Sequence, residues 1–206
     1  MKSDLIALID YGEGNLGSVE KALRHVGCDV QITNSPAVLD AADGVVMPGV
    51  GAFDDCVHGL EKSGLIEPIK QLITDGKPFL GICLGLQMLF AGSEEGQRDG
   101  LGLLPGRVVR FRHELKVPQI GWNQVSKVHY APHLDGIDSG SWVYFVHSYY
   151  VVPDDEAVIA TTTDYGIEFC SSIWCDNLFA CQFHPEKSQA VGLKVLDNFR
   201  KLVEGA

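Results

Sequence analysis

The sequence predicts an α/β fold in which a mostly parallel central sheet is flanked by helices and carries additional antiparallel strands. Two observations lead to this prediction. In the first 90 residues, short apolar strands alternate with helical stretches, as in a parallel sheet that is covered on both faces. From Leu103 to Phe183 the chain changes to β-rich runs that Gly, Pro and Asp separate, a pattern typical of strands joined by turns.

The N-terminal half begins with a βα unit. Leu5 to Ile9 is a short apolar strand, a Gly-rich turn spans Tyr11 to Asn15, and apolar residues then recur at helical spacing from Leu16 to Val26. The pattern repeats, with strands expected at Val30 to Thr33, Gly44 to Met47 (ended by Pro48-Gly49) and Phe79 to Ile82, and helices at Pro36 to Ala41, Ala52 to about Asp75 and Leu84 to Phe90.

The C-terminal half is expected to extend or flank the first sheet. Its β-rich runs are Arg107 to Phe111, Trp142 to Val152, Ala157 to Thr162 and Phe179 to Phe183. The last segment, Gln189 to Val203, has its apolar residues on one face and predicts a closing amphipathic helix.

Length and composition limit the classes of protein that fit. A chain of 206 residues with 46% hydrophobic residues can bury one substantial core, so a single domain over residues 1–206 is expected. The formal net charge is −11 and no Lys/Arg cluster could neutralise a run of phosphates, which argues against a nucleic-acid partner. The apolar run Leu5 to Ile9 is too short for a signal peptide or a membrane span, so we expect a cytoplasmic protein with reduced cysteines and no membrane partner.

A candidate nucleophile lies between the strand that ends at Ile82 and the helix that begins at Leu84. In GICLGLQ, Cys83 has a glycine two residues away on each side, and a sharp strand-to-helix turn requires small residues there. At a helix N-terminus, the macrodipole would favour the thiolate of Cys83. The alternative is a buried structural cysteine at a Gly-containing junction.

A candidate base follows an apolar strand in the segment Phe183-His184-Pro185-Glu186. Residues i and i+2 of an extended chain project to the same side, so Glu186 can orient the imidazole of His184 towards Cys83. Pro185 biases His184 towards the extended conformation that this geometry needs. The alternative is a surface turn that ends a strand. The other histidines lie mostly in polar loops, where solvent exposure would explain them.

A metal site is a third possibility, with Cys170, Cys175, Cys181 and His184 as ligands. Their spacings of five, six and three residues do not match a CxxC zinc pattern, so we expect no metal and no cofactor. The five cysteines other than Cys83 are better explained as core or incidental thiols.

An oxyanion site is expected where Pro48-Gly49-Val50-Gly51 follows a strand. A Gly-rich turn there can direct backbone N–H groups at a developing oxyanion, and the N–H of Leu84 would be the second donor. The alternative is a tight turn before a helix.

Together, PGVGAF at 48–53, GICLGLQ at 81–87 and HPE at 184–186 resemble the class I (triad) glutamine amidotransferases, and the resemblance spans nearly the whole chain. Further segments look like the glutaminase subunit of imidazole glycerol phosphate synthase: YGEGN at 11–15, SEEG at 93–96, PQIGWN at 118–123, YFVHSYY at 144–150 and QFHPEKS at 182–188.

The resemblance implies roles for matching residues. Cys83 would attack the carboxamide of glutamine, His184 would move protons, and Glu186 would orient His184. Gly49, Val50 and Gly51 would form the oxyanion strand, which is thought to rearrange in some members of the family. The other matching positions are those that hold glutamine, Gln87, Glu95, Ser148 and Tyr149, and those near the synthase interface, Tyr11, Asn15, Trp122, Tyr144 and Lys187.

The resemblance also implies a partner. This would be a (β/α)8-barrel cyclase subunit, which would receive ammonia and form imidazole glycerol phosphate in histidine biosynthesis. Two alternatives stay open: the glutaminase of another synthesis, such as that of anthranilate or pyridoxal phosphate, and a catalytically silent binding subunit. One departure is that Gln119 stands where many relatives carry His, which puts the local contacts of that segment in doubt.

Overall fold

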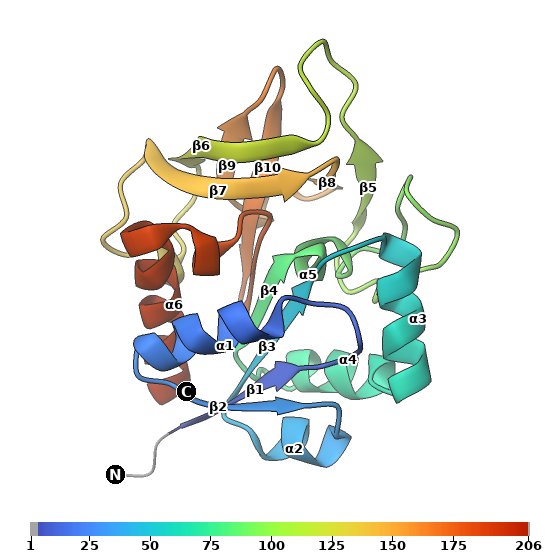
Figure 1. The fold of residues 1–206 in the computed structure, drawn as a ribbon, viewed down its shortest axis with the longest axis vertical. Helices are drawn as coiled ribbons and strands as arrows, with labels where there is room; N and C mark the ends of the chain where they lie inside the picture. The colour runs from blue at the N-terminus through green and yellow to red at the C-terminus, as the bar shows by residue number, and fades with distance from the viewer. Residues whose placement is uncertain (1–3, 206) are drawn as a thin grey trace.

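The computed structural model describes residues 4–205 and confirms the predicted fold class (Figure 1). One sheet holds eleven strands, nine of them in the order β2-β1-β3-β4-β11-β10-β9-β6-β7, with β5 and β8 attached beside β10. The strands are β1 Leu5–Ile9, β2 Asp29–Thr33, β3 Gly44–Gly49, β4 Phe79–Cys83, β5 Gly106–Arg110, β6 Gln119–Lys127, β7 Ser141–His147, β8 Tyr149–Pro153, β9 Ile159–Asp164, β10 Glu168–Cys175 and β11 Leu178–Cys181.

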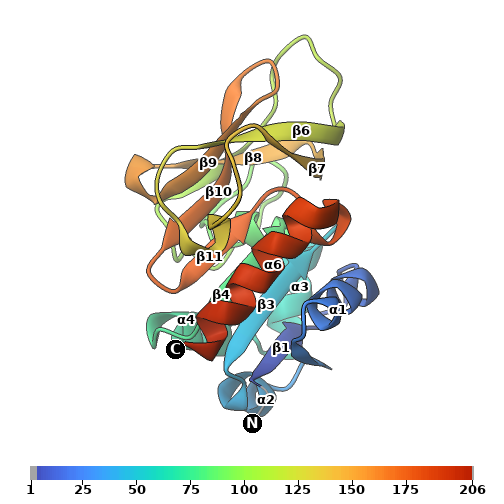
Figure 2. The same cartoon turned by 90° about the vertical axis from the view of Figure 1, so that its left-hand side faces the viewer.

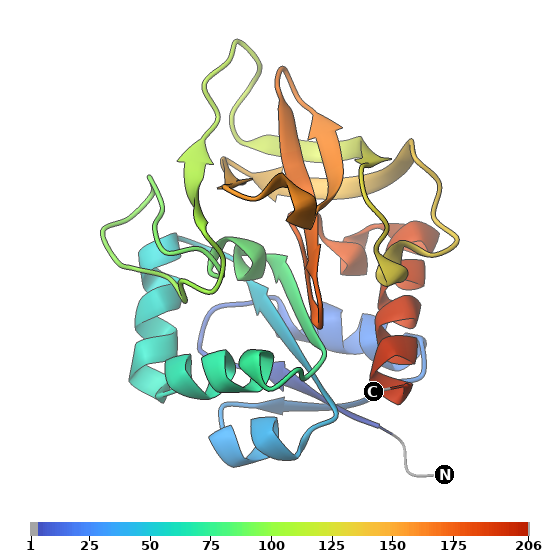
Figure 3. The ribbon, with the colours of Figure 1, turned by 180° about the vertical axis from the view of Figure 1, so that it is seen from behind.

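The helices lie on both faces of the parallel part of the sheet (Figures 2 and 3). They are α1 Leu16–His25, α2 Pro36–Ala41, α3 Phe53–Ser63, α4 Ile66–Thr74, α5 Leu84–Gln87 and α6 Gln189–Glu204, with short 3-10 turns η1 Pro132–Leu134, η2 Glu156–Val158 and η3 Pro185–Lys187. Within residues 4–205, no helix is both long and apolar enough to cross a membrane.

Alternation along β1 divides the hydrophobic core into two clusters. Ala7 and Ile9 belong to the cluster that includes residues of α2, α3 and α4, whereas Ile6 and Leu8 belong to the cluster that includes residues of α1 and α6. Because successive side chains of a strand point to opposite faces, a strand buried on both faces is apolar throughout. This explains why the β1 segment could be predicted without a period-two pattern.

The topology brings several strand ends to one edge of the sheet. Strands β2, β1, β3, β4 and β11 are parallel, and β1 lies between β2 and β3, so the chain changes direction across the sheet at β1. In open α/β sheets, ligands bind at the carboxyl ends of the strands beside such a switch point. Here those ends place Gly49 beside Cys83, its partner in the β3–β4 register.

Several of the expected elements differ from those in the structure. Strand β3 continues through Pro48 to Gly49, and the single helix expected from Ala52 to about Asp75 is two helices, because Gly64 adopts a left-handed conformation (φ 66°) that ends α3. Trp142 to Val152 is two strands that meet at Ser148. Strands β6 and β10 were not named as strands in advance.

Helix α5 is also shorter than expected, ending at Gln87 instead of Phe90. The carbonyls of Met88 and Leu89 accept hydrogen bonds from the backbone N–H groups of Leu101 (2.7 Å) and Leu103 (2.8 Å). In a helix that ended at Phe90, the N–H groups of Leu89 and Phe90 would donate to carbonyls four residues earlier, but they donate to Leu86 and Gln87, three residues earlier, both at 3.2 Å. The helix therefore tightens into a turn after Gln87, and the returning chain pairs with the carbonyls that follow.

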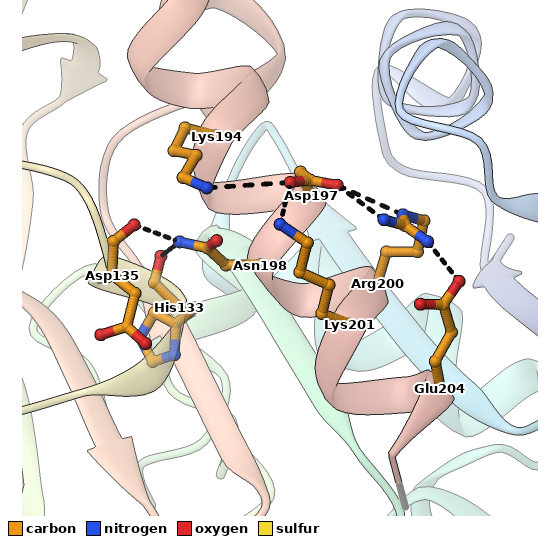
Figure 4. A network of polar contacts seen from close by, with 8 residues as sticks. All are labelled: His133, Asp135, Lys194, Asp197, Asn198, Arg200, Lys201 and Glu204. Atoms are coloured by element: carbon orange, nitrogen blue, oxygen red, sulfur yellow. Dashed lines mark hydrogen bonds and ion pairs between the residues drawn. The ribbon is translucent and has the colours of Figure 1, made fainter.

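Helix α6 is held by its buried and its exposed face (Figure 4). The buried amide of Asn198 donates to the backbone carbonyls of His133 (3.0 Å) and Asp135 (2.8 Å), which fixes η1 against the helix. On the solvent side, Asp197 pairs with Arg200 at 2.9 Å and Lys201 at 2.6 Å. Surface ion pairs of this kind each stabilise by at most about 1 kcal/mol, so packing dominates.

Helix α5 lies directly on β3, and Gly85 makes this contact possible. A Cβ atom at Gly85 would lie 2.1 Å from the carbonyl oxygen of Met47 and 3.2 Å from its carbonyl carbon. Both atoms belong to the backbone of a central strand, which cannot move as a flexible side chain would. The close approach therefore requires a glycine.

We expect Gly85→Ala to lower the free energy of unfolding by more than about 2 kcal/mol, because the added methyl overpacks the α5–β3 contact. Gly17→Ala is the matched control: Gly17 is exposed near the start of α1 and an added Cβ meets nothing within 4 Å. That control should be neutral or stabilising by up to about 1 kcal/mol. Urea denaturation of both variants measures the difference, and equal effects would contradict the packing argument.

Candidate active site

Cys83 is the last residue of β4 and directly precedes α5, in a strained backbone conformation with φ 56° and ψ −108°. A residue with a side chain seldom adopts positive φ, and such residues concentrate at functional sites. Gly81 is part of the same constraint, since a Cβ there would lie 2.8 Å from the carbonyl oxygen of Gly85. The glycines on either side of Cys83 thus have the steric role that the sequence predicts.

His184 and Glu186 follow strand β11 and lie in contact. His184 is extended (φ −99°, ψ 98°), and its Nδ1 lies 2.9 Å from Oε1 of Glu186. Both side chains are buried, with exposed fractions of 4% and 1%. The backbone of His184 is fixed too, because its N–H donates to the carbonyl of Tyr144 at 2.9 Å and its carbonyl accepts from the hydroxyl of Ser188 at 2.6 Å. The imidazole is therefore held by β7 and by the start of α6.

The charge state of His184 depends on its two neighbours. Burial disfavours the imidazolium, but a hydrogen bond and charge attraction from Cys83 and then from Glu186 outweigh it and raise the pKa of His184 to about 10. An imidazolium between a sulfur and a carboxylate is the arrangement in which a thiolate is stabilised. His184 is thus held as an imidazolium, paired with the carboxylate of Glu186 at 2.9 Å.

A cavity of about 310 Å³ opens over Cys83 and His184. The four residues expected to hold glutamine all line it: Gln87, Glu95, Ser148 and Tyr149. Of the expected oxyanion residues, Val50, Gly51 and Leu84 line it as well, while Gly49 lies just behind as the last residue of β3. The carboxylate of Glu95 accepts from the backbone N–H of Phe53 at 3.0 Å, and burial raises its pKa.

Two side chains hold the expected oxyanion strand from behind. The hydroxyl of Tyr11 donates to the carbonyl of Pro48 at 2.7 Å, and the thiol of Cys56 on α3 donates to the carbonyl of Val50 at 3.5 Å. The C=O and N–H of a trans peptide point in opposite directions, so the N–H of Gly51 points away from Cys56. Burial raises the pKa of Cys56 to about 12, which keeps its thiol protonated as a donor.

The residues expected near a partner lie in different environments. Trp122 on β6 is 43% exposed and its ring meets that of Tyr144 on β7 edge to face, with centroids 5.9 Å apart. Lys187 is exposed at the cavity rim, and Asn15 is half-buried at the start of α1. Tyr11 differs from expectation, because it is only 6% exposed and its hydroxyl faces the oxyanion strand. Its side chain therefore offers little surface to another protein.

The expectation that the other histidines are solvent-exposed was wrong for His133 and His147, which are 0% and 6% exposed. His147 lines the cavity, and Gln119 contacts it. Nδ1 of His147 lies 2.8 Å from the carbonyl of Tyr149, and Nε2 lies 2.9 Å from the side-chain amide of Gln119. Burial lowers the pKa of His147 to about 4, so its ring is neutral with one donor nitrogen.

The neutral ring of His147 determines how Gln119 is oriented. The carbonyl of Tyr149 can only accept, so Nδ1 carries the hydrogen and Nε2 must receive one. The structure places Oε1 of Gln119 at Nε2, but oxygen and nitrogen of a side-chain amide are assigned from their partners, and only the opposite orientation, with the Gln119 nitrogen at Nε2, satisfies the neutral ring. The carbonyl of Tyr149 thus fixes the tautomer of a cavity-lining histidine, and the ring in turn orients Gln119.

Two polar neighbours of the sulfur were missed. Cys83 Sγ lies 3.5 Å from the amide Nε2 of Gln182 and 3.8 Å from the carbonyl of Val146. The alternation that places Glu186 beside His184 also places Gln182 on the side of His184, two residues earlier. Along β7, Val143, Phe145 and His147 are buried, but the residues between them are apolar as well, so no period-two pattern in the sequence marks His147 as inward-facing.

The proposed metal ligands do not form a group. Within residues 4–205, no three His, Cys, Asp or Glu side chains are arranged so that they could hold a metal ion. Cys170 and Cys181 are buried, and Cys175 is partly buried, as free thiols. Burial raises the pKa of Cys170 to about 12.

Comparison with known proteins places this geometry in a family. Residues 7–202 match the family model of class I glutamine amidotransferases. Imidazole glycerol phosphate synthase subunit HisH of Syntrophotalea carbinolica is 55% identical over 95% of this chain and 98% of its own length. The same subunit of Aquifex aeolicus is 53% identical over 96% of each chain.

Solved structures share the fold at much lower identity. The structure of PurLQS from Thermotoga maritima covers 100% of this chain with a TM-score of 0.76 at 16% identity. A crystal structure of a glutamine amidotransferase covers 96% of this chain, also with a TM-score of 0.76 and 16% identity. The chain therefore belongs to the class I glutamine amidotransferase family, and within it to the group of the HisH subunits of imidazole glycerol phosphate synthase.

Proposed function

We propose that this chain is the glutaminase subunit of an imidazole glycerol phosphate synthase. It hydrolyses glutamine to glutamate and ammonia with Cys83, His184 and Glu186, and passes the ammonia to a (β/α)8-barrel cyclase subunit in histidine biosynthesis. Relatives above 50% identity over nearly their whole length carry that synthase name, which favours this reading over the glutaminase of another synthesis.

One observation carries the proposal. A strained cysteine, a buried histidine and a buried carboxylate, from two segments about 100 residues apart, meet at one cavity of about 310 Å³. A nucleophile in contact with a base that a third group orients is the arrangement of covalent catalysis at acyl groups. A catalytically silent binding subunit would not need a nucleophile held in positive φ.

The first chemical step forms a thioester. The thiolate of Cys83 adds to the carboxamide carbon of glutamine, and the negative charge moves to the carbonyl oxygen. The N–H of Leu84 and those of the strand at 49–51 would stabilise this oxyanion, and losing one such donor costs about 100- to 1000-fold in rate. The imidazolium of His184 gives its proton to the departing amide nitrogen, so ammonia leaves and the C–N bond is broken.

The second step hydrolyses the thioester. Neutral His184 removes a proton from a water molecule, which adds to the thioester carbon. The C–S bond breaks, glutamate leaves, and the sulfur returns as a thiolate beside the imidazolium of His184. Glu186 accepts from the Nδ1–H of His184 throughout and stabilises the imidazolium without taking its proton.

The cavity has polar groups left free for the substrate. Gln87 lines the cavity, and its buried Oε1 has no hydrogen-bond partner among residues 4–205, which leaves one unsatisfied acceptor at the cavity wall. The carboxylate of Glu95 supplies negative charge for an α-ammonium group, and Ser148 and Tyr149 line the same cavity. These contacts support glutamine as the ligand.

Exposed apolar side chains on β6 and β7 support a partner. Ile120 is 58% exposed, Trp122 43% and Trp142 53%. Large aromatic side chains are enriched at the centres of protein interfaces. Free ammonia is protonated in neutral water and then cannot act as a nucleophile, so a synthase needs delivery from one subunit to the other. Docking of the cyclase over this face would serve that purpose.

Cys83→Ala is expected to abolish glutamine-dependent synthesis by the complex with its cyclase and to leave synthesis from added ammonium salts intact. The reason is that the thioester cannot form, whereas the cyclase still receives ammonia from solution. Product formation from each nitrogen source measures this. Cys175→Ala, a partly buried cysteine away from the cavity, is the matched control and should keep both activities. Glutamine-dependent turnover in Cys83→Ala would remove Cys83 from the mechanism.

Because the pKa of His184 is raised to about 10 from an unfolded value near 6.5, its protonation stabilises the fold fully below about pH 6.5 and less as the pH rises towards 10. Cys83→Ala and Glu186→Gln each remove a neighbour that favours the imidazolium of His184, so that less remains to offset the effect of burial. Each variant should therefore lower the titration midpoint of His184 by about one pH unit or more. NMR of labelled histidine measures this, with the signal assigned from His184→Gln. An unchanged midpoint in both variants would disprove the ion-pair arrangement.

Trp122→Ala and Trp142→Ala are expected to weaken binding to the cyclase by about tenfold or more, because both remove large exposed apolar surfaces. Glutaminase activity of the isolated chain should stay the same. Calorimetry with the cyclase subunit measures binding, and Tyr130→Ala, which is 74% exposed, is the control for a single exposed aromatic residue elsewhere. Wild-type affinity in both tryptophan variants would exclude this face as the interface.

A further inference from the structure

A buried chain of side-chain amides ends at the sulfur of Cys83. The Nε2 of Gln182 lies 3.5 Å from Cys83 Sγ, and its Oε1 accepts from Nε2 of Gln87 at 3.0 Å. Gln182 is 0% exposed and Gln87 is 3% exposed, so solvent does not compete for these contacts.

A backbone carbonyl decides which end of each amide faces its neighbour. The carbonyl of Tyr149 can only accept, and it receives Nε2 of Gln87 at 3.1 Å. Because the NH2 end of Gln87 is fixed in this way, its second hydrogen meets the oxygen of Gln182. Gln182 must then present its own NH2 group to the sulfur. The opposite orientation of Gln182 would place its NH2 group against the NH2 group of Gln87, where neither group could accept.

We propose that Gln182 is a further catalytic residue, whose amide N–H donates to the thiolate of Cys83, and that Gln87 is a positioning residue that holds this amide in the donating orientation. A thiolate accepts a hydrogen bond more strongly than a neutral thiol, and hydrogen bonds to charged groups are roughly twice as strong as neutral ones. The contact thus favours the reactive form of the sulfur.

The donor complements the other groups that face Cys83. These are His184 backed by Glu186, together with Tyr11 at the end of β1, Cys56 on α3 and Cys181 on β11. Glu95 and Lys187 border the same cavity. All of these can change charge with pH. Gln182 cannot, so it supplies a donor that is constant across the pH range.

The catalytic meaning of this inference rests on the proposed glutaminase cycle. In that cycle, the hydrogen bond from Gln182 matters at the stages in which the sulfur of Cys83 is negatively charged. The negative charge leaves the sulfur when the thioester forms and returns when the C–S bond breaks. Gln182 would therefore favour departure of the thiolate during hydrolysis as well as its presence before attack.

The test measures alkylation of Cys83 by iodoacetamide in the full chain without glutamine, followed by mass spectrometry of the peptide that contains Cys83. Rates are measured from about pH 5 to about pH 10, which spans the ordinary thiol pKa near 8.5, because iodoacetamide reacts with the thiolate. Gln182→Met keeps the size of the side chain and removes the donor. We expect alkylation about tenfold slower at the low end of the range and equal to wild type at the high end.

Three further variants separate this effect from a change in structure. Gln87→Leu should give a smaller loss with the same convergence at high pH, because Gln182 keeps its donor but loses its fixed orientation. Asn198→Leu removes a buried amide of α6 far from the sulfur, and should alkylate at the wild-type rate. Gln182→Glu replaces the donor by a carboxylate, and its Cys83 should be alkylated more slowly at neutral pH than that of Gln182→Met. If Gln182→Met does not fold, Gln182→Glu tests whether the donor is needed.

Wild-type rates at low pH in Gln182→Met and Gln182→Glu would overturn the proposal. So would a reduction by the same factor at every pH, which would indicate changed access to the sulfur. Because alkylation requires no glutamine, these outcomes are independent of the proposed function. A wild-type chain that shows the expected alkylation but never hydrolyses glutamine would instead overturn the function and leave the role of the amide standing.

Discussion

The close approach of α5 to strands β3 and β4 is the constraint on which the site depends. Gly85 lies against the carbonyl of Met47, and Gly81 lies against the carbonyl of Gly85. With the helix this near, the residue that joins β4 to α5 must take a positive φ, and Cys83 does so at 56°. The sulfur consequently stands above the carboxyl edge of the sheet, where His184 reaches it from β11. Backbone packing sets the position of the sulfur, and side-chain contacts set the charge of the imidazole beside it.

The charge of each histidine at the site depends on whether neighbouring groups offset the effect of burial on its pKa. Burial alone would deprotonate His184, yet its pKa lies at about 10 because a sulfur and a carboxylate flank it. His147 is buried at the same cavity with neutral hydrogen-bond partners, and burial together with repulsion from His184 lowers its pKa to about 4. Two histidines at one cavity therefore carry different charges, and the difference arises from what each ring contacts and not from how deeply it is buried.

Local patterns predicted the fold class, the strand-to-helix turn at Cys83 and the contact between His184 and Glu186, because each depends on residues at most a few positions apart. The failures depend on distant residues. After α5, the carbonyls of Met88 and Leu89 pair with Leu101 and Leu103, so the path of the chain there depends on a distant segment. Tyr11 belongs to the interior because Pro48 lies across from it. Gln119 could be seen as a departure from relatives, but its contact with His147 follows only from the pairing of β6 with β7.

The two anchors behind the segment at 48–51 differ in strength. A tyrosine hydroxyl at 2.7 Å from a carbonyl is a strong donor, whereas a thiol at 3.5 Å is a weak one. Pro48 is therefore tied firmly to the protein interior and Val50 only loosely. The peptide between Val50 and Gly51, which borders the cavity, therefore has the smaller barrier to rotation. The backbone is rigid at Pro48, where it continues the sheet, and compliant at Val50, where it meets a ligand.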